Sequence, residues 1–556
     1  MELNMTVAIN FDGQQMDPDS PVGIGVATEE FLRALFRFGS QDTFPVVCSD
    51  ESAFGIFREF SQESRIDASR CISVNQNDAA KLEEIGTLFR YDPAFIKHVW
   101  ARRYHGQRRY SLAGIVHASS TDAVMEVAGQ YLTAPTQVWD ALICPSQAIR
   151  ATILKVIEGW QEYLGDRFKA DQPCPMEFPV IPLGTDIIKF KKLTSEGFRA
   201  RQRNNLGISP AGEDVVILFV GRLNFVAKAN PLPLMIGLEK VATKLDTPVK
   251  LVFSGYFNDD LSEEGFKEAA AKICNKLEVV FVRHSDPQYP DGLWAGADIF
   301  CSLVDNIQES FGLTPIEAMA ANLPVVVSDW DGYRDTVRDG IDGFTIPTIM
   351  PAAGFGRDLA YDYFARPGHY GDYLGGTQQS TAVDIDELVN ALKKLIANPG
   401  LRRTMGDSGR ERATYKYNWS LVISAYEDLW RELAEKRESA DEVAPMQQSG
   451  SFHPSHPDPF AMFESFATHN ITADSKVELV TTDWAEVMKL ISLKTGLVYS
   501  GSLMELEDLP FLIGQLENGK KSKVSDILRL LPQIEPAAVV RTLAWLIKLG
   551  ICRYHV

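Results

Sequence analysis

Short apolar runs alternate with amphipathic stretches through the second half of this chain, and this alternation constrains the fold more than any other feature. The apolar runs occupy residues 215–220, 249–255, 279–282, 299–304, 324–328 and 343–347. Runs of this length without a polar face are typical of strands that are buried on both sides. Strands interleaved with helices predict a parallel, doubly wound α/β sheet.

The first half carries weaker signals of the same kind. Strands are predicted at residues 5–10, 44–49, 114–117 and 139–144, and helical patterns are predicted from the second of these strands to about residue 90. The first strand leads into a glycine-rich stretch with Gly23 and Gly25, and an amphipathic helix follows. A strand, a glycine-rich turn and a helix can hold a phosphate group, although a plain turn accounts for the same residues.

Residues 309–329 combine a loop, a short helix and a buried strand. Thr314 suits the N-cap position, Pro315 suits the first helical position, and Glu317 lies three residues after the cap, which predicts a capping box. The loop before Thr314 would then direct free backbone N–H groups toward a phosphate. From this spacing alone, Glu309 and Glu317 could equally be a solvated loop acid and a cap.

Three further polar side chains follow predicted strands, at the edge where open α/β sheets bind ligands. Gly221 and Arg222 follow the run at 215–220, and Lys228 lies on the same loop. A guanidinium fork and an ammonium group suit a diphosphate. His117 ends the strand at 114–117. Alternatively, Arg222 and Lys228 could be ordinary surface cations, and His117 could have a purely structural role.

The sequence from Glu309 to Glu317 closely resembles the E-x7-E signature of glycosyltransferase family 4, whose members are retaining enzymes with the GT-B fold. Similar motifs surround His117 and the Arg222–Lys228 loop, and the resemblance covers about residues 5–435. It implies two Rossmann-like domains, each with a doubly wound parallel sheet, that face a cleft.

This chain departs from the family pattern at several places. Residues 349–377 form an insertion rich in aromatic residues, which could stack on sugars or cover a core. The point departures are Leu183 and Thr185 in place of Asn and Val, Asn322 in place of Gly, and Asp335 in place of Glu.

The resemblance implies an enzyme of the hexosyltransferase type that moves a sugar from a UDP-, GDP- or ADP-sugar to a hydroxyl group of a glycan, lipid or small molecule. No cofactor or metal is expected, because cationic side chains replace the metal. The implied catalytic residues are His117, Arg222 and Glu309. The implied donor-binding residues are Gly23, Gly25, Arg222, Lys228, Ser310, Phe311, Gly312, Leu313 and Glu317. The alternatives are an epimerase or phosphorylase of the same fold, or a non-catalytic scaffold that keeps the donor site and acts through its C-terminal tail.

A chain of 556 residues is too long for one core, so several domains are predicted. We expect a Rossmann-like acceptor-side domain at 1–190 and a Rossmann-like nucleotide-sugar domain at 191–418. A closing helix at 419–437 is expected to pack back on the first domain, before a polar linker at 438–470. Residues 471–556 resemble a small α+β winged-helix-like module.

The net charge of −19 argues against generic nucleic-acid binding. The second long helix of the tail has only Arg541 and Lys548 as basic residues, so a protein partner or a second copy of the chain is expected there instead of DNA. The chain start has no signal-peptide layout, which predicts a cytoplasmic protein, at most peripheral at the inner membrane face. The basic and aromatic segment 95–110 is either a solvated helix face or a surface for an anionic acceptor or membrane edge.

Overall fold

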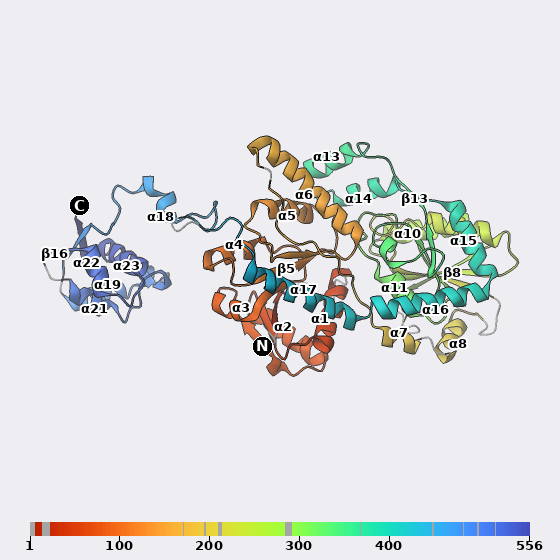
Figure 1. The fold of residues 1–556 in the computed structure, drawn as a ribbon, viewed down its shortest axis with the longest axis horizontal. Helices are drawn as coiled ribbons and strands as arrows, with labels where there is room; N and C mark the ends of the chain where they lie inside the picture. Colours follow the sequence, from red (N-terminus) through yellow and green to blue (C-terminus); the bar gives the residue numbers. More distant parts are fainter. Residues whose placement is uncertain are drawn as a thin grey trace. The chain divides into compact units, whose positions relative to one another are not determined.

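A computed structural model of the chain describes residues 6–13, 23–170, 172–193, 196–208, 214–283, 292–366, 368–446, 450–481, 483–497, 500–516 and 519–555. The chain divides into two compact units, Met1–Phe452 and His453–Val556, and Figure 1 shows the elements of each. Among the described residues, no helix is both long and apolar enough to cross a membrane.

The first unit begins with a sheet of parallel strands in the order β3-β2-β1-β4-β5-β6. With helices α1 to α6, this sheet forms what we call the first lobe. The strands are β1 Thr6–Phe11, β2 Phe44–Cys48, β3 Cys71–Val74, β4 Gly86–Arg90, β5 Ser111–Ile115 and β6 Ala141–Ile143. The helices are α1 Gly23–Phe38, α2 Glu51–Glu63, α3 Ala79–Ile85, α4 Ile96–His105, α5 Asp122–Thr133 and α6 Gln147–Phe168.

The second lobe of this unit repeats the plan, with strand order β12-β11-β10-β7-β8-β9 and all pairs parallel. Its strands are β7 Val215–Arg222, β8 Val249–Tyr256, β9 Glu278–Arg283, β10 Ile299–Ser302, β11 Val325–Ser328 and β12 Gly343–Ile346. Its long helices are α9 Leu232–Ala242, α10 Asp260–Ile273, α15 Ile385–Ala397 and α16 Pro399–Lys416. Its shorter helices are α7 Ile187–Leu193, α8 Glu196–Asn205, α11 Leu313–Ala320, α12 Tyr333–Thr336, α13 Arg357–Ala365 and α14 Tyr370–Gln379.

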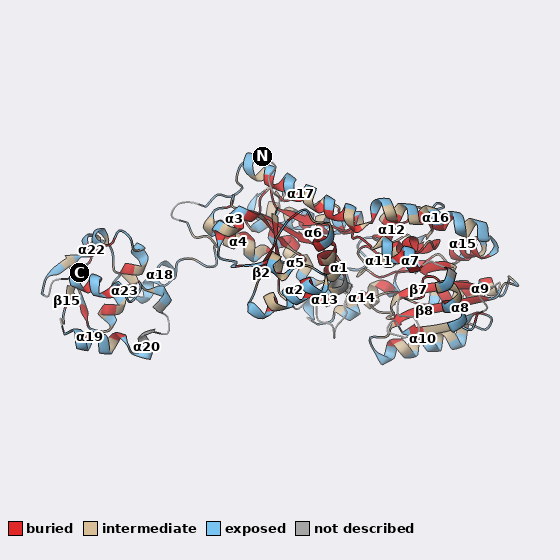
Figure 2. Cartoon of the chain, turned by 90° about the horizontal axis from the view of Figure 1, so that it is seen from below, coloured by how far each residue is buried: buried red, intermediate tan, exposed pale blue. Residues whose placement is uncertain are grey.

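Both strand orders follow the doubly wound Rossmann pattern, in which the first and fourth strands are neighbours and the chain leaves them in opposite directions. The predicted fold class, two Rossmann-like sheets with a small α+β tail, is confirmed. Figure 2 shows the reason for the apolar runs in the sequence, because the strands of both sheets are buried beneath partly exposed helices.

Part of the first lobe was predicted wrongly, because β3 and β4 lie in the stretch to which helical patterns were assigned. Strand β4 is short, and Thr87, Leu88 and Phe89 are all buried at the centre of the sheet. A short apolar run of this kind cannot be told from a buried helix by periodicity alone. Gly86, with φ 93°, ends α3 and begins β4, a left-handed turn that glycine adopts without strain.

Helix α17, Trp419–Ser439, leaves the second lobe and packs against the first. Its Tyr426 ring lies 5.0 Å from the ring of Phe31 on α1, and Trp430 lies 5.8 Å from Phe89 on β4. Aromatic burial of this size fixes the end of the chain's second lobe onto the first sheet.

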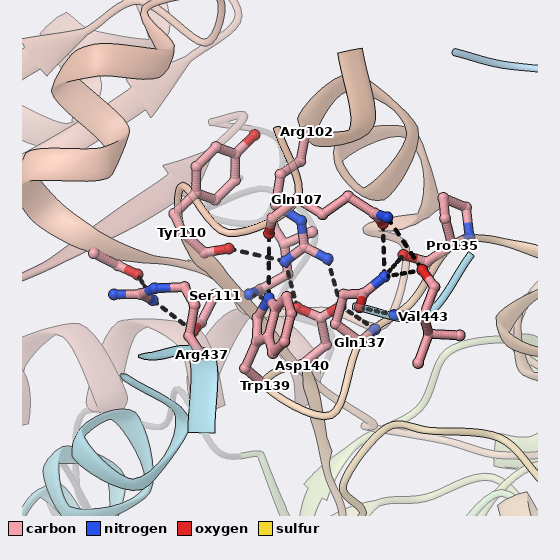
Figure 3. Close-up of polar contacts among 12 residues, drawn as sticks. Arg102, Gln107, Tyr110, Ser111, Pro135, Gln137, Trp139, Asp140, Arg437 and Val443 are labelled. Atoms are coloured by element: carbon pink, nitrogen blue, oxygen red, sulfur yellow. Dashed lines mark hydrogen bonds and ion pairs between the residues drawn. The ribbon is translucent and has the colours of Figure 1, made fainter. Parts of the chain in front are cut away.

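A buried polar network secures this return (Figure 3). Arg102 and Asp140 form a two-pronged ion pair, with Nη1 2.5 Å and Nη2 2.7 Å from the two carboxylate oxygens, and both side chains are fully buried. Beside them, the side-chain amide of Gln137 donates to the carbonyl oxygen of Val443 and accepts from the backbone N–H of Val443, at 2.8 Å each. Arg437 of α17 donates to the Ser111 hydroxyl at 2.7 Å.

The arginines of segment 95–110 are therefore used within the first unit. Arg103 donates to the carbonyl oxygen of Phe452, Arg108 donates to that of Arg437, and Arg109 pairs with Glu83. The first two contacts tie Phe452 and Arg437 to α4 and the loop after it. They leave less cationic surface for an anionic acceptor or a membrane than the sequence pattern suggested.

The second unit is a small α+β module with an antiparallel sheet in the order β16-β15-β17. Its strands are β15 Lys476–Leu479, β16 Lys521–Lys523 and β17 Cys552–His555. Its helices are α18 Pro459–Met462, α19 Trp484–Ile491, α20 Lys494–Leu497, α21 Leu509–Gln515, α22 Val524–Leu530 and α23 Pro536–Lys548. The predicted pair of helices followed by a terminal strand is present. The closer likeness to a winged helix stays a prediction, because β17 pairs with β15 from the start of the module.

Candidate functional site

The predicted donor-binding residues gather at the carboxyl edge of the second sheet. Arg222 is the last residue of β7, and the loop from β10 to α11 carries Glu309. Strands β7 and β10 are neighbours on either side of the point where the strand order reverses. Ligands of open α/β sheets bind outside the carboxyl ends of the strands at this point.

Lys228 and Glu309 form an ion pair in this structure. The side chains are 19% and 10% exposed, so water screens the pair only weakly. Burial alone would raise the pKa of Glu309, but the ammonium group of Lys228 and hydrogen bonds from backbone amides outweigh burial and lower it. Glu309 is therefore ionised at neutral pH, and a diphosphate would compete with it for Lys228.

Arg222 is held beside this pair. Its Nη2 donates to the side-chain oxygen of Gln308 at 3.0 Å and lies 3.4 Å from the carbonyl oxygen of Ala227. Gln308 precedes Glu309, so both predicted cations are anchored to the same short loop. Asn306 of that loop donates to the carbonyl oxygen of Val226 at 2.6 Å, which joins the loop to the one that carries Lys228.

The predicted capping box at Thr314 is wrong. Helix α11 begins at Leu313, its N-cap is Gly312 with φ 91°, and no side chain caps it. A Cβ atom on Gly312 would lie 2.1 Å from the Tyr333 ring, so only glycine fits the turn. Because this left-handed turn starts the helix earlier than a Thr314 cap would, Glu317 lies one turn into the helix. At the other end, Asn322 adopts φ 67°, the conformation in which Asn replaces Gly most readily.

Glu317 faces two charged residues instead of the helix start. Burial raises the pKa of Glu317, and Lys189 of α7 partly opposes this effect. Burial and the nearby Glu317 raise the pKa of Glu30, on α1 of the first lobe, to about 8. Glu317, the second acid of the E-x7-E string, therefore lies where the two lobes meet, close to Glu30 of the first lobe and Lys189 of the second.

His117 lies directly beyond β5 in the first lobe. Its Nε2 is 3.0 Å from the carbonyl oxygen of Tyr91, which can only accept, so Nε2 carries the hydrogen. Burial lowers the pKa of His117 to about 4, despite this hydrogen bond. The imidazole is therefore neutral at pH 7, with Nδ1 available to accept a hydrogen bond.

The two lobes meet beside the Glu309 loop. The Ser146 hydroxyl, at the N-cap of α6, donates to the carbonyl oxygen of Ser310 at 2.7 Å. The backbone N–H of Gln147 donates to the carboxylate of Asp335 at 2.5 Å. Phe311 is buried, with its ring 6.1 Å from that of Tyr417. The Glu309 loop is thus held by contacts with the first lobe and by contacts within the second lobe.

Asp331 belongs to this site although the sequence pattern did not single it out. It adopts φ 44°, an uncommon conformation outside glycine, and its Oδ1 is buried without a hydrogen-bond partner among the described residues. Burial and the Glu309 carboxylate raise the pKa of Asp331 to about 8. Two neighbouring carboxyl groups therefore differ in charge at neutral pH. Gln308 was missed as well, since neither residue follows a spacing rule.

The glycine-rich loop is only partly described. Gly23 and Gly25 lie in the first turn of α1, and residues 14–22 before them lie outside the described part of the chain. One pocket lies between α1, residues 186–189 and the start of α17, and a smaller one is lined by Asn230, Pro231 and their apolar neighbours. Neither is lined by Arg222, Lys228 or Glu309. The described residues contain no group of three His, Cys, Asp or Glu side chains placed to hold a metal ion.

Several curated proteins are similar to part of this chain. The D-inositol 3-phosphate glycosyltransferase of Kribbella flavida is 28% identical over 259 residues, which are 45% of this chain and 49% of that protein. The phosphatidyl-myo-inositol mannosyltransferase of Mycobacterium leprae is 32% identical over 270 residues, 48% of this chain and 59% of that protein. The chain thus spans about half the length of the curated relatives it matches.

Among solved structures, Anabaena HepE in complex with UDP and glucose aligns with a TM-score of 0.49 and 15% identity, over 77% of this chain and 100% of that one. The family model of the glycosyl transferases group 1 matches residues 201–353, which include Arg222, Lys228 and the whole Glu309–Glu317 segment. Residues 201–353 of this chain are therefore similar to the group 1 glycosyl transferases, and they contain the second-lobe part of the site.

Proposed function

We propose that this chain is a retaining glycosyltransferase, which moves a sugar from a nucleotide-diphosphate sugar to a hydroxyl acceptor without a metal ion. The observation that carries the proposal is the placement of Arg222, Lys228 and Glu309 together at the switch point of the second sheet. The match of residues 201–353 to a glycosyltransferase model and the names of the two curated relatives support it.

In this proposal the leaving group is a nucleoside diphosphate, whose negative charge grows as the sugar bond breaks. Arg222 and Lys228 stabilise that charge, since cations fixed before the reaction need little reorganisation. The backbone amides near Gly312 add to this field. These groups supply the positive charge that a divalent ion would otherwise provide.

Glu309 and His117 would position the transferred sugar. Glu309 is ionised and accepts hydrogen bonds from sugar hydroxyls once Lys228 turns to the diphosphate. His117 is neutral and offers Nδ1 as an acceptor. Glu317, in helix α11, would hold the nucleotide ribose, and Gly23 and Gly25 would face the phosphates and the acceptor. The donor base and sugar, UDP-, GDP- or ADP-linked, are open.

Binding of a nucleoside diphosphate is expected to persist without divalent ions. Isothermal titration with UDP, GDP and ADP should give, for the preferred nucleotide, a Kd that changes less than about twofold between EDTA and Mg²⁺, because the diphosphate charge is met by side chains. Lys228→Met should weaken this binding, whereas Lys240→Met, an exposed lysine paired with Asp386, should not. Complete loss of binding in EDTA would contradict the metal-free proposal.

We infer that the second unit serves a protein partner or a second copy of the chain. Helix α19 buries Val487 and Ile491 in the module core, while Trp484 and Met488 stay 41% and 43% exposed on another face. An exposed aromatic and a methionine on one helix suit a protein contact more than a phosphate backbone. Full-length protein should therefore show no salt-dependent binding to duplex DNA in fluorescence anisotropy. Micromolar affinity that falls steeply with salt would contradict this reading.

A further inference from the structure

The aromatic insertion that follows β13, Thr348–Ile349, reaches from the second lobe to the first. The hydroxyl of Tyr370, the first residue of α14, lies 2.7 Å from the hydroxyl of Ser120. The backbone N–H of Asp122 donates to the hydroxyl of Tyr363 on α13 at 3.1 Å. Ser120 belongs to the segment between β5 and α5 that also carries His117, and Asp122 is the first residue of α5.

The contact of Tyr363 completes a helix end. Thr121 is the N-cap of α5 but makes no side-chain capping hydrogen bond, so an N–H of the first turn needs another partner. The Tyr363 hydroxyl supplies it from the other lobe. The phenol is buried and its ring stacks on Tyr373 at 4.8 Å, which holds it in this position.

The far end of α14 is fixed beneath the donor site. Gln378 donates to the buried carboxyl group of Asp305, and its side-chain oxygen lies 3.3 Å from Nδ2 of Asn306. Asp305 and Asn306 lead into the loop with Gln308 and Glu309. Helix α14 is therefore attached to the Glu309 loop at one end and to the first lobe at the other.

Tyr370 also lies near the diphosphate side of the site. Burial raises the pKa of Tyr370, and the nearby side chains of Ser120, Gln308 and Arg222 partly oppose this effect. Gln308 in turn accepts from Arg222 at 3.0 Å. Arg222 and Gln308 of the second lobe therefore lie near the Tyr370 hydroxyl that contacts Ser120 of the first.

We propose that Tyr370 is a positioning residue, which holds the His117 segment of the first lobe in register with Arg222 and Glu309 of the second. This inference rests on the proposed transfer, in which donor and acceptor groups come from different lobes. Reaction between them depends on placement within a fraction of an ångström, and a fixed contact between the lobes provides it. The role differs from stacking on a sugar, because it is the hydroxyl group of Tyr370 that acts.

Tyr370→Phe removes this hydroxyl and keeps the ring. We expect kcat to fall about 5- to 20-fold, the size of one lost hydrogen bond. The Kd of the nucleoside diphosphate should change less than about twofold, because the Arg222–Gln308 contact lies within one lobe. Ser120→Ala should match it, and the double variant should be no slower than the slower single one, since both remove the same contact. Tyr361→Phe, at a 68% exposed position of the same insertion, is the matched control.

Hydrogen exchange of the full chain gives a readout that does not need turnover. Added nucleoside diphosphate should slow amide exchange at residues 222–228 in both the wild type and Tyr370→Phe, and at residues 118–123 in the wild type only. Protection at 222–228 without any at 118–123 in the wild type, or additive kinetic effects of the two single variants, would overturn the positioning role while the proposed function stands. No protection at 222–228 with any nucleotide would overturn both.

Discussion

Glu309→Gln is expected to lower kcat by roughly 10²- to 10³-fold, the loss typical of one removed electrostatic contact in a transition state. The same substitution should not weaken nucleotide binding. The substitution removes the charge that now holds Lys228, so the ammonium group becomes available to a diphosphate, and the Kd of the nucleoside diphosphate should stay equal or fall. Turnover assays and titration calorimetry on the same preparation measure both quantities.

Arg222→Ala should lower kcat by a similar factor, but it should also weaken nucleoside diphosphate binding, because the guanidinium contacts the ligand in the ground state as well. The matched control for Glu309→Gln is Glu278→Gln, which disrupts another Lys–Glu pair of the same sheet. Glu278 lies 2.8 Å from Lys250, and its side chain is 61% exposed. That variant should have wild-type turnover. Wild-type activity in Glu309→Gln would show that the reacting sugar lies elsewhere.

The second large effect concerns stability. Arg102→Ala or Asp140→Ala is expected to lower the free energy of unfolding by about 3–5 kcal/mol, because each leaves one buried charge without its partner. Asp140 also accepts from the backbone N–H groups of Leu112 and Gln137, at 3.0 and 2.9 Å, so its loss leaves further donors unpaired. Urea denaturation of the full chain, followed by tryptophan fluorescence, measures the change.

Arg431→Ala is the control for this prediction. Arg431 pairs with Asp428 at 2.6 Å, but the two side chains are 50% and 65% exposed, so the change should cost less than about 1 kcal/mol. Replacing Arg102 and Asp140 together by Met and Leu should recover part of the lost stability, because no charge is then left buried alone. Equal losses from Arg102→Ala and Arg431→Ala would contradict the argument.

Local sequence patterns were sufficient where burial is uniform. The six strands of the second sheet were predicted because each is a short apolar run between helices, and the parallel, doubly wound arrangement follows from that alternation. Strands β3 and β4 were missed, since β3 alternates poorly and β4 follows a helix after a single glycine. The start of α11 was misplaced because Gly312 turns the chain in a conformation that a capping rule for Thr314 does not consider.

The sequence by itself determined the second sheet, the ends of its strands, and the candidate residues Arg222, Lys228 and Glu309, because these depend on residue type and local spacing. Tertiary structure decided which of them touch. Lys228 pairs with Glu309, although 81 positions separate the two in the chain. Arg102 of segment 95–110 is buried against Asp140, and Arg108 meets the carbonyl oxygen of Arg437 only because the chain folds back. Tyr370 joined the site for the same reason, because a contact across 250 positions to Ser120 leaves no periodic trace in a sequence.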